Sequence, residues 1–173
     1  SEPYGETWVY ESIVGAIPGV ELSDRQAIAV QLGIFQTGIV VLALVYDLWD
    51  AVLPGTVAVV VAAAGSGVMR QFGRRTRELD LPDPYRRLLF GSSIEVVLGI
   101  LAFVALVTHL FIFDPRTADP TLLTGLFGPD PPVPVVYLTL LILWDLCYRI
   151  GTSWWGAVVA LWRSWRYAFD PAT

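Results

Sequence analysis

The sequence contains no lysine, and all 11 of its basic residues are arginine. Without lysine no Schiff base forms, which excludes covalently bound retinal and pyridoxal chemistry. Cys147 is the only cysteine and His109 the only histidine, which excludes an intramolecular disulfide, a multi-cysteine metal site and bis-histidine haem. Only 16% of the residues are charged, and the net charge of −5 argues against nucleic acid as a partner. We interpret this acidic, lysine-free composition as halophilic in type.

Hydrophobic residues are abundant instead. They make up 55% of the 173 residues, with a mean hydropathy of +0.60. A helix needs about 20 apolar residues to cross the ~30 Å core of a bilayer. Four runs have that length or nearly so, at residues 27–49, 52–69, 88–113 and 135–162. They leave no polar helical faces to cover a soluble core, so the sequence predicts an all-α, multi-pass cell-membrane protein with a four-helix transmembrane bundle within residues 27–168.

Both ends of the chain carry signals of the membrane surface. Residues 1–26 are acidic, and residues 7–17 within them contain Trp8 and Tyr10, which favours an interfacial amphipathic helix. We expect no cleavable signal peptide there, because no basic segment precedes an apolar one. Residues 152–169 hold four tryptophans and two arginines, a mixture typical of headgroup level. The fourth run either continues as one long helix or bends near Gly151, and residues 169–173 form a tail.

Arginine placement predicts the orientation. Segment 70–87, expected to be a loop, holds six of the 11 arginines, whereas segment 114–134 holds only Arg116. Loops rich in arginine stay on the cytoplasmic side, so we expect the 70–87 loop and both termini to be cytoplasmic. Segment 114–134 also contains six prolines, so no long helix fits there.

The apolar runs also contain ionisable and polar residues that recur on one helical stripe in each of three runs. These are Gln36, Asp47 and Asp50 in the first, Glu95 and His109 in the third, and Asp145, Arg149 and Thr152 in the fourth. Charged residues at membrane depth usually face the protein interior, and small residues share these stripes. We therefore expect the three stripes to turn towards one another.

Depth suggests which of these residues meet. At 1.5 Å per helical residue, Glu95 lies about 10 Å and Arg149 about 9 Å from the inner boundary. Asp145 is one turn from Arg149 on the same face. We predict a cluster of Glu95, Asp145 and Arg149 in the inner half, and an outer polar group of Asp47, Asp50 and His109.

Each group also has a purely structural interpretation. In this interpretation Asp47 and Asp50 are simply hydrated, because they lie at the end of the first apolar run. His109 is one helical turn from the membrane boundary and is simply an interfacial residue. The inner cluster is either an ion group that only fixes helix packing or part of a route for ions or protons. We interpret Cys147 as a packing residue.

No motif of an enzyme is present: the chain has no nucleophile–base pair, metal-ligand set, glycine-rich phosphate loop or CxxC pair. We expect no enzyme, no cofactor and no metal. The preferred hypothesis is a small homo-oligomeric channel or transporter that moves ions or protons along Glu95, Asp145 and Arg149, with Gln36 and Thr152 on the pore face. The alternative is a scaffold or accessory subunit of a membrane complex. The channel or transporter hypothesis is favoured if all outer surfaces of the bundle suit lipid. The scaffold hypothesis is favoured if the monomer leaves a face of small residues without a packing partner.

Overall fold

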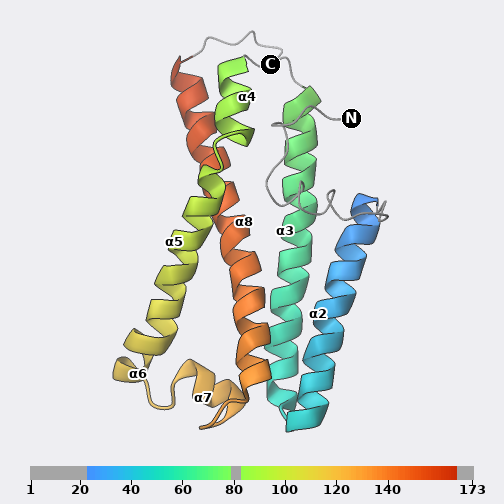
Figure 1. The fold of residues 1–173 in the computed structure, drawn as a ribbon, viewed down its shortest axis with the longest axis vertical. Helices are drawn as coiled ribbons and strands as arrows, with labels where there is room; N and C mark the ends of the chain where they lie inside the picture. Colours follow the sequence, from blue (N-terminus) through green and yellow to red (C-terminus); the bar gives the residue numbers. More distant parts are fainter. Residues whose placement is uncertain (1–22, 79–82, 167–173) are drawn as a thin grey trace.

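The computed structural model describes residues 23–78 and 83–166, and within these ranges every regular element is a helix. Four helices are long and apolar enough to cross a membrane (Figure 1). Their cores are α2 (Asp24–Tyr46), α3 (Val52–Glu78), α5 (Ile94–Thr108) and α8 (Val133–Arg166). The prediction of an all-helical chain with four such helices is confirmed. The interfacial helix expected at 7–17 and the tail at 169–173 lie outside the described residues.

A tight turn joins α2 to α3. Helix α2 begins with a capping box, in which Ser23 and Gln26 satisfy each other's backbone amides. It ends at Asp47, whose left-handed backbone (φ 55°, ψ 41°) turns the chain so that the amide of the next residue, Leu48, also donates to the carbonyl oxygen of Ala43, at 3.1 Å. The short helix η1 (Trp49–Ala51) follows, and α3 begins directly after it. Pro54 lies in the first turn of α3, where a missing amide hydrogen leaves no helical bond unmade.

Segment 70–87 is largely helical, contrary to the expected loop. Helix α3 continues to Glu78, and α4 (Asp83–Phe90) begins after residues 79–82. Arginine and glutamine are good helix formers, so the helix extends beyond the point where the apolar run stops. Arg75 and Arg77 therefore lie in the last turn of α3.

The segments around α5 are irregular. Ser93, in a left-handed conformation (φ 53°), separates α4 from α5. Beyond Thr108 the chain continues through a π-helical turn, η2 (His109–Phe113), into α6 (Asp114–Thr117). Helix α7 (Leu122–Phe127) follows, capped by the side chain of Thr121. Segment 114–134 therefore holds only short helices before α8 begins.

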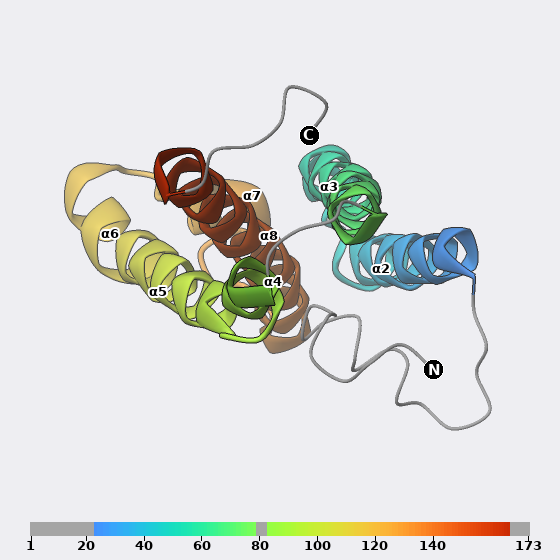
Figure 2. The same ribbon diagram turned by 90° about the horizontal axis from the view of Figure 1, so that it is seen from above.

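Helix α8 is the central element. It is one uninterrupted helix of 34 residues, so it continues past Gly151 without a break. Helices α2, α3, α4 and α5 all pack against it. Figure 2 places α5 on one side of α8 and α2 with α3 on the other.

Two apolar clusters hold the helices together. The first joins α4 to α8 at the arginine-rich end, where Trp155 also donates its indole N–H to the carbonyl oxygen of Leu88 at 3.2 Å. Its buried members are Tyr85, Leu89, Phe90 and Val159. The second joins α2, α3 and α8 nearer the other end, with Ile39, Val59 and Ile142 buried.

Candidate functional site: a buried polar network on the central helix

Asp145 and Arg149 form an ion pair in the middle of α8. The Nη2 atom of Arg149 donates to Oδ1 and Oδ2 of Asp145 at 2.9 and 2.8 Å, and its Nε donates to Oδ2 at 3.1 Å. The side chain of Arg149 is only 10% exposed and that of Asp145 only 13%. Charge-assisted bonds of this geometry are among the strongest that side chains form. The two opposite charges neutralise each other within one helix.

Two other helices contribute to the same network. The Nη1 atom of Arg149 donates to the hydroxyl of Ser66 on α3. On α2, the Nε2 atom of Gln31 donates to Oδ2 of Asp145 at 3.2 Å. A Cβ atom added to Gly65 would lie 3.3 Å from Cδ of Arg149, so glycine at this position lets the arginine stem lie against α3. The network therefore links α2, α3 and α8 at one level.

The sequence reasoning missed Gln31 and Ser66 as members of this network. Each left a weak signal. Ser66 lies on the small-residue stripe of α3 with Ala58 and Ala62, and Gln31 is a polar residue within an apolar run. Neither signal identifies a partner, because both contacts join residues far apart in the chain.

Glu95 of α5 lies close to the level of Arg149 but packs against another face of α8. Its carbonyl oxygen would lie 2.8 Å from a Cβ atom on Gly151, only two residues along α8 from Arg149. Two residues correspond to about 200° around a helix, and Arg149 is directed at α3 instead. The side chain of Glu95 is fully buried, and it is not an acceptor of the Arg149 hydrogen bonds. The predicted cluster is thus divided between the α3–α8 and α5–α8 contacts.

The expected outer polar group does not assemble. Asp47 and Asp50 are exposed at the turn between α2 and α3, whereas His109 is exposed at the end of α5 and stacks on Phe113, with 6.5 Å between the ring centroids. Helices α2 and α5 lie on opposite sides of α8 (Figure 2). Periodicity placed each residue on a stripe but did not give the order of the helices around α8.

Gln36 and Thr152, expected on a pore face, each have local partners. Gln36 donates its side-chain amide to the hydroxyl of Thr56 at 3.0 Å, which joins α2 to α3. Thr152 is buried and donates to the carbonyl oxygen of Tyr148, one turn back on α8, at 2.9 Å. Both side chains contribute to packing contacts between or along helices.

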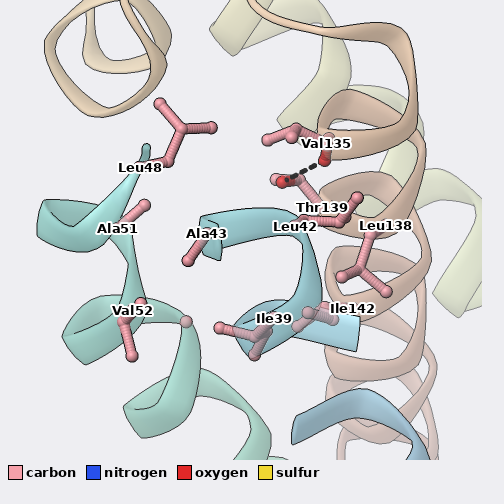
Figure 3. Close-up of a pocket in the computed structure, with 11 residues that line it drawn as sticks. Ile39, Leu42, Ala43, Leu48, Ala51, Val52, Val135, Leu138, Thr139 and Ile142 are labelled. Atoms are coloured by element: carbon pink, nitrogen blue, oxygen red, sulfur yellow. Dashed lines mark hydrogen bonds between the residues drawn. The ribbon is translucent and has the colours of Figure 1, made fainter. Parts of the chain in front are cut away.

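The cavities between Asp145 and the α2–α3 turn are small. One of about 10 Å³ touches Gln31 and Asp145, which is room for about one water molecule. Another, of about 60 Å³, lies between the α2–α3 turn and the start of α8 (Figure 3). Its lining is apolar except for Thr139, whose hydroxyl donates to the carbonyl oxygen of Val135 at 2.8 Å. The buried cluster of Ile39, Val59 and Ile142 lies between the two cavities.

These features define the class: a helical protein with four apolar, membrane-length helices and an ion pair buried on the central one. The chain belongs to a family of unknown function, DUF7530, whose model matches residues 3–173. No curated protein and no solved structure matches it. Among residues 23–78 and 83–166, no three histidine, cysteine or acidic side chains are grouped closely enough to hold a metal ion.

Proposed function

We propose that the protein is a non-catalytic scaffold or accessory subunit of a membrane assembly, and that its four long helices cross the bilayer. The observation that carries this proposal is the pairing of Arg149 inside the chain: its guanidinium donates to Asp145 and Ser66. The carboxylate of Asp145 neutralises the charge of Arg149, which lowers the cost of inserting α8 into a membrane, and the bond to Ser66 links α8 to α3. A charge held in this way is poorly suited to exchange a mobile ion.

The surroundings of the ion pair support the same interpretation. A transport route needs polar groups or water along its length. Beside Asp145 there is room for about one water molecule. Towards the turn between α2 and α3, the next layer is the apolar cluster around Ile39 and Ile142. An ion leaving the network in this direction would cross hydrocarbon side chains.

The outer faces of the bundle support a partner. Helix α5 presents large aliphatic side chains such as Val97, Leu101 and Val104, which suit lipid. Helix α2 exposes Ala29, Gly33 and Thr37 at four-residue spacing, and a Cβ atom on Gly33 would meet nothing within 4 Å. Small residues at this spacing allow close approach of another helix. This is the unfilled small-residue face that favours an accessory or scaffold role.

One observation favours the second candidate, a proton or ion transporter. Asp145 keeps 13% of its side chain exposed and borders the 10 Å³ cavity with Gln31. A carboxylate at a hydrated site is a common relay for protons in membrane transport. Here Asp145, and not the enclosed Glu95, would be the group that moves the proton.

Flux through liposomes separates the two candidates. Purified protein is reconstituted, and proton and potassium flux are recorded for the wild type and for Asp145→Asn. We expect both to equal protein-free liposomes. Flux in the wild type that Asp145→Asn abolishes, at a temperature where circular dichroism shows this variant to be still folded, would overturn the scaffold proposal in favour of transport.

A second measurement tests the assembly directly. Native gels of solubilised membranes compare the wild type with Gly33→Leu and with Gly67→Leu, a matched control on α3 where a Cβ atom also meets nothing within 4 Å. We expect the wild type and Gly67→Leu to migrate in a complex much larger than the 19.1 kDa chain, and Gly33→Leu to be released from it. Migration of all three as single chains would refute the proposal.

A further inference from the structure

A groove runs between α3 and α8 near their arginine-rich ends. Its volume is about 330 Å³, at the small end of the range of roughly 300–1,000 Å³ found for ligand pockets. Val68, Met69 and Phe72 line it from α3, and Gly156, Ala157 and Ala160, together with the hydroxyl-bearing Thr152 and Ser153, line it from α8. Most of the lining is therefore hydrocarbon, with no charged side chain in it.

The small residues of α8 create this groove. The ring of Phe72 lies 3.6 Å from the position that a Cβ atom on Gly156 would occupy, so the two helices touch at that level. Next to this contact, alanines at 157 and 160 leave space that longer side chains would fill. Two bulky residues of this part of α8, Trp155 and Trp162, pack towards α4 instead.

The groove ends in positive charge. On α3, Val68, Phe72 and Arg75 follow one another at positions i, i+4 and i+7, and on α8 Gly156, Ala160 and Arg163 repeat the same spacing. These positions lie on one face of a helix. Because α3 and α8 run in the same direction (Figure 1), both arginines lie one turn beyond the groove at the same end.

The wider surroundings are also basic. Beyond Phe72 and Ala160, the described residues of α3, α4 and α8 carry seven arginines: Arg74, Arg75, Arg77, Arg86, Arg87, Arg163 and Arg166. The same stretches carry two acidic residues, Glu78 and Asp83. The described residues around the end of the groove therefore carry a net positive charge.

We propose that this groove binds an anionic phospholipid, with an acyl chain along Phe72, Gly156 and Ala160 and the phosphate between Arg75 and Arg163. The apolar slot and the basic mouth match the two parts of such a lipid, and arginine pairs with phosphate oxygens through two parallel hydrogen bonds. Basic pockets between transmembrane helices bind anionic headgroups in this way. A docked helix matches less well, because a helix with its side chains is about 10–12 Å across. The proposal rests on membrane insertion and not on the scaffold role.

The test is native mass spectrometry of the full chain in detergent, titrated with phosphatidylglycerol or with phosphatidylcholine of the same acyl chains. We expect tighter binding of phosphatidylglycerol, and about a thirtyfold weaker binding of it by the double variant Arg75→Gln/Arg163→Gln, the size of effect that two arginines near an anionic headgroup supply. The matched control is Arg74→Gln, since Arg74 is exposed but about 160° away from the groove face of α3. Its affinity should equal that of the wild type.

The apolar half of the site has its own pair of variants. Ala157→Leu fills the groove, whereas Val158→Leu adds bulk on a different face of α8. We expect only Ala157→Leu to weaken binding of phosphatidylglycerol. Equal affinity for the two lipids, or equal losses in Arg74→Gln and the double variant, would refute the headgroup site. Unchanged lipid binding in Ala157→Leu, or dimers of the wild type that this variant abolishes, would refute lipid as the occupant of the groove.

Discussion

Gly99 of α5 and Gly151 of α8 bring two helices into backbone contact. A Cβ atom on Gly151 would lie 2.5 Å from the amide nitrogen of Gly99 and 2.8 Å from the carbonyl oxygen of Glu95. A Cβ atom on Gly99 would lie 3.1 Å from the Cα atom of Tyr148. Such close approach maximises dispersion contacts, which drive helix association where lipid removes the hydrophobic driving force.

Gly151→Ala should therefore separate α5 from α8. The atoms that the new methyl group meets belong to the backbone of α5, so the whole helix must shift, and we expect a loss of about 2 kcal/mol or more of unfolding free energy. Gly67→Ala is the control, because nothing lies within 4 Å of its Cβ position; it should be neutral or stabilising by up to about 1 kcal/mol. Unfolding in mixed detergent micelles measures both. Equal stability of Gly151→Ala and wild type would contradict the close contact.

Cys147 offers a reporter of the same contact. Its side chain is buried, at 3% exposure, and its carbonyl oxygen lies 3.6 Å from the Cβ position of Gly99. We expect a maleimide to label the native protein slowly and Gly151→Ala much faster, with adducts counted by mass spectrometry. Ser164→Cys, at an exposed position of α8, should gain one adduct at once and so controls for reagent activity. Rapid labelling of Cys147 in the folded wild type would show that α5 does not cover it.

Hydropathy predicted the number and type of the long helices but not where they end. The second apolar run stops near residue 69, whereas α3 continues to Glu78. Arginine and glutamine end the apolar run but continue the helix, since their helix propensities are high. The apolar run at 88–113 contains a break at Ser93, which hydropathy alone does not detect. The length of an apolar run indicates which residues suit the bilayer core, whereas the ends of a helix depend on backbone hydrogen bonds and capping.

For the candidate site, local spacing was informative and global arrangement was not. Asp145 and Arg149 are one turn apart on one helix, so their pairing follows from sequence. The rise per residue also placed Glu95 close to the level of Arg149. What could not be predicted is which neighbour covers each face of α8. That order decides that Arg149 meets Ser66, and that His109 lies across the bundle from Asp47.

The two partners of the ion pair should differ from Ser66 in their effect on stability. Asp145→Asn leaves the Arg149 charge buried without its carboxylate, and we expect a loss of about 3 kcal/mol or more. Ser66→Ala removes one hydrogen bond between helices and should cost only about 0.6–1.7 kcal/mol. The double variant Asp145→Asn/Arg149→Gln should lose less than the sum of its single variants, because no unpaired charge remains. Detergent unfolding of the four variants measures these values, and strictly additive losses would argue against the coupling.

The arginine-rich end of the bundle should face the cytoplasm, which cysteine accessibility in whole cells measures. The variants combine Cys147→Ser with Asp130→Cys, between α7 and α8, or with Arg74→Cys, near the end of α3; both positions are exposed. A membrane-impermeant maleimide should label Asp130→Cys in intact cells and Arg74→Cys only after lysis. The physical reason is the bias of arginine towards the cytoplasmic side of short loops. Labelling of Arg74→Cys in intact cells, with Asp130→Cys protected until lysis, would reverse the predicted orientation and place the proposed lipid groove in the outer leaflet.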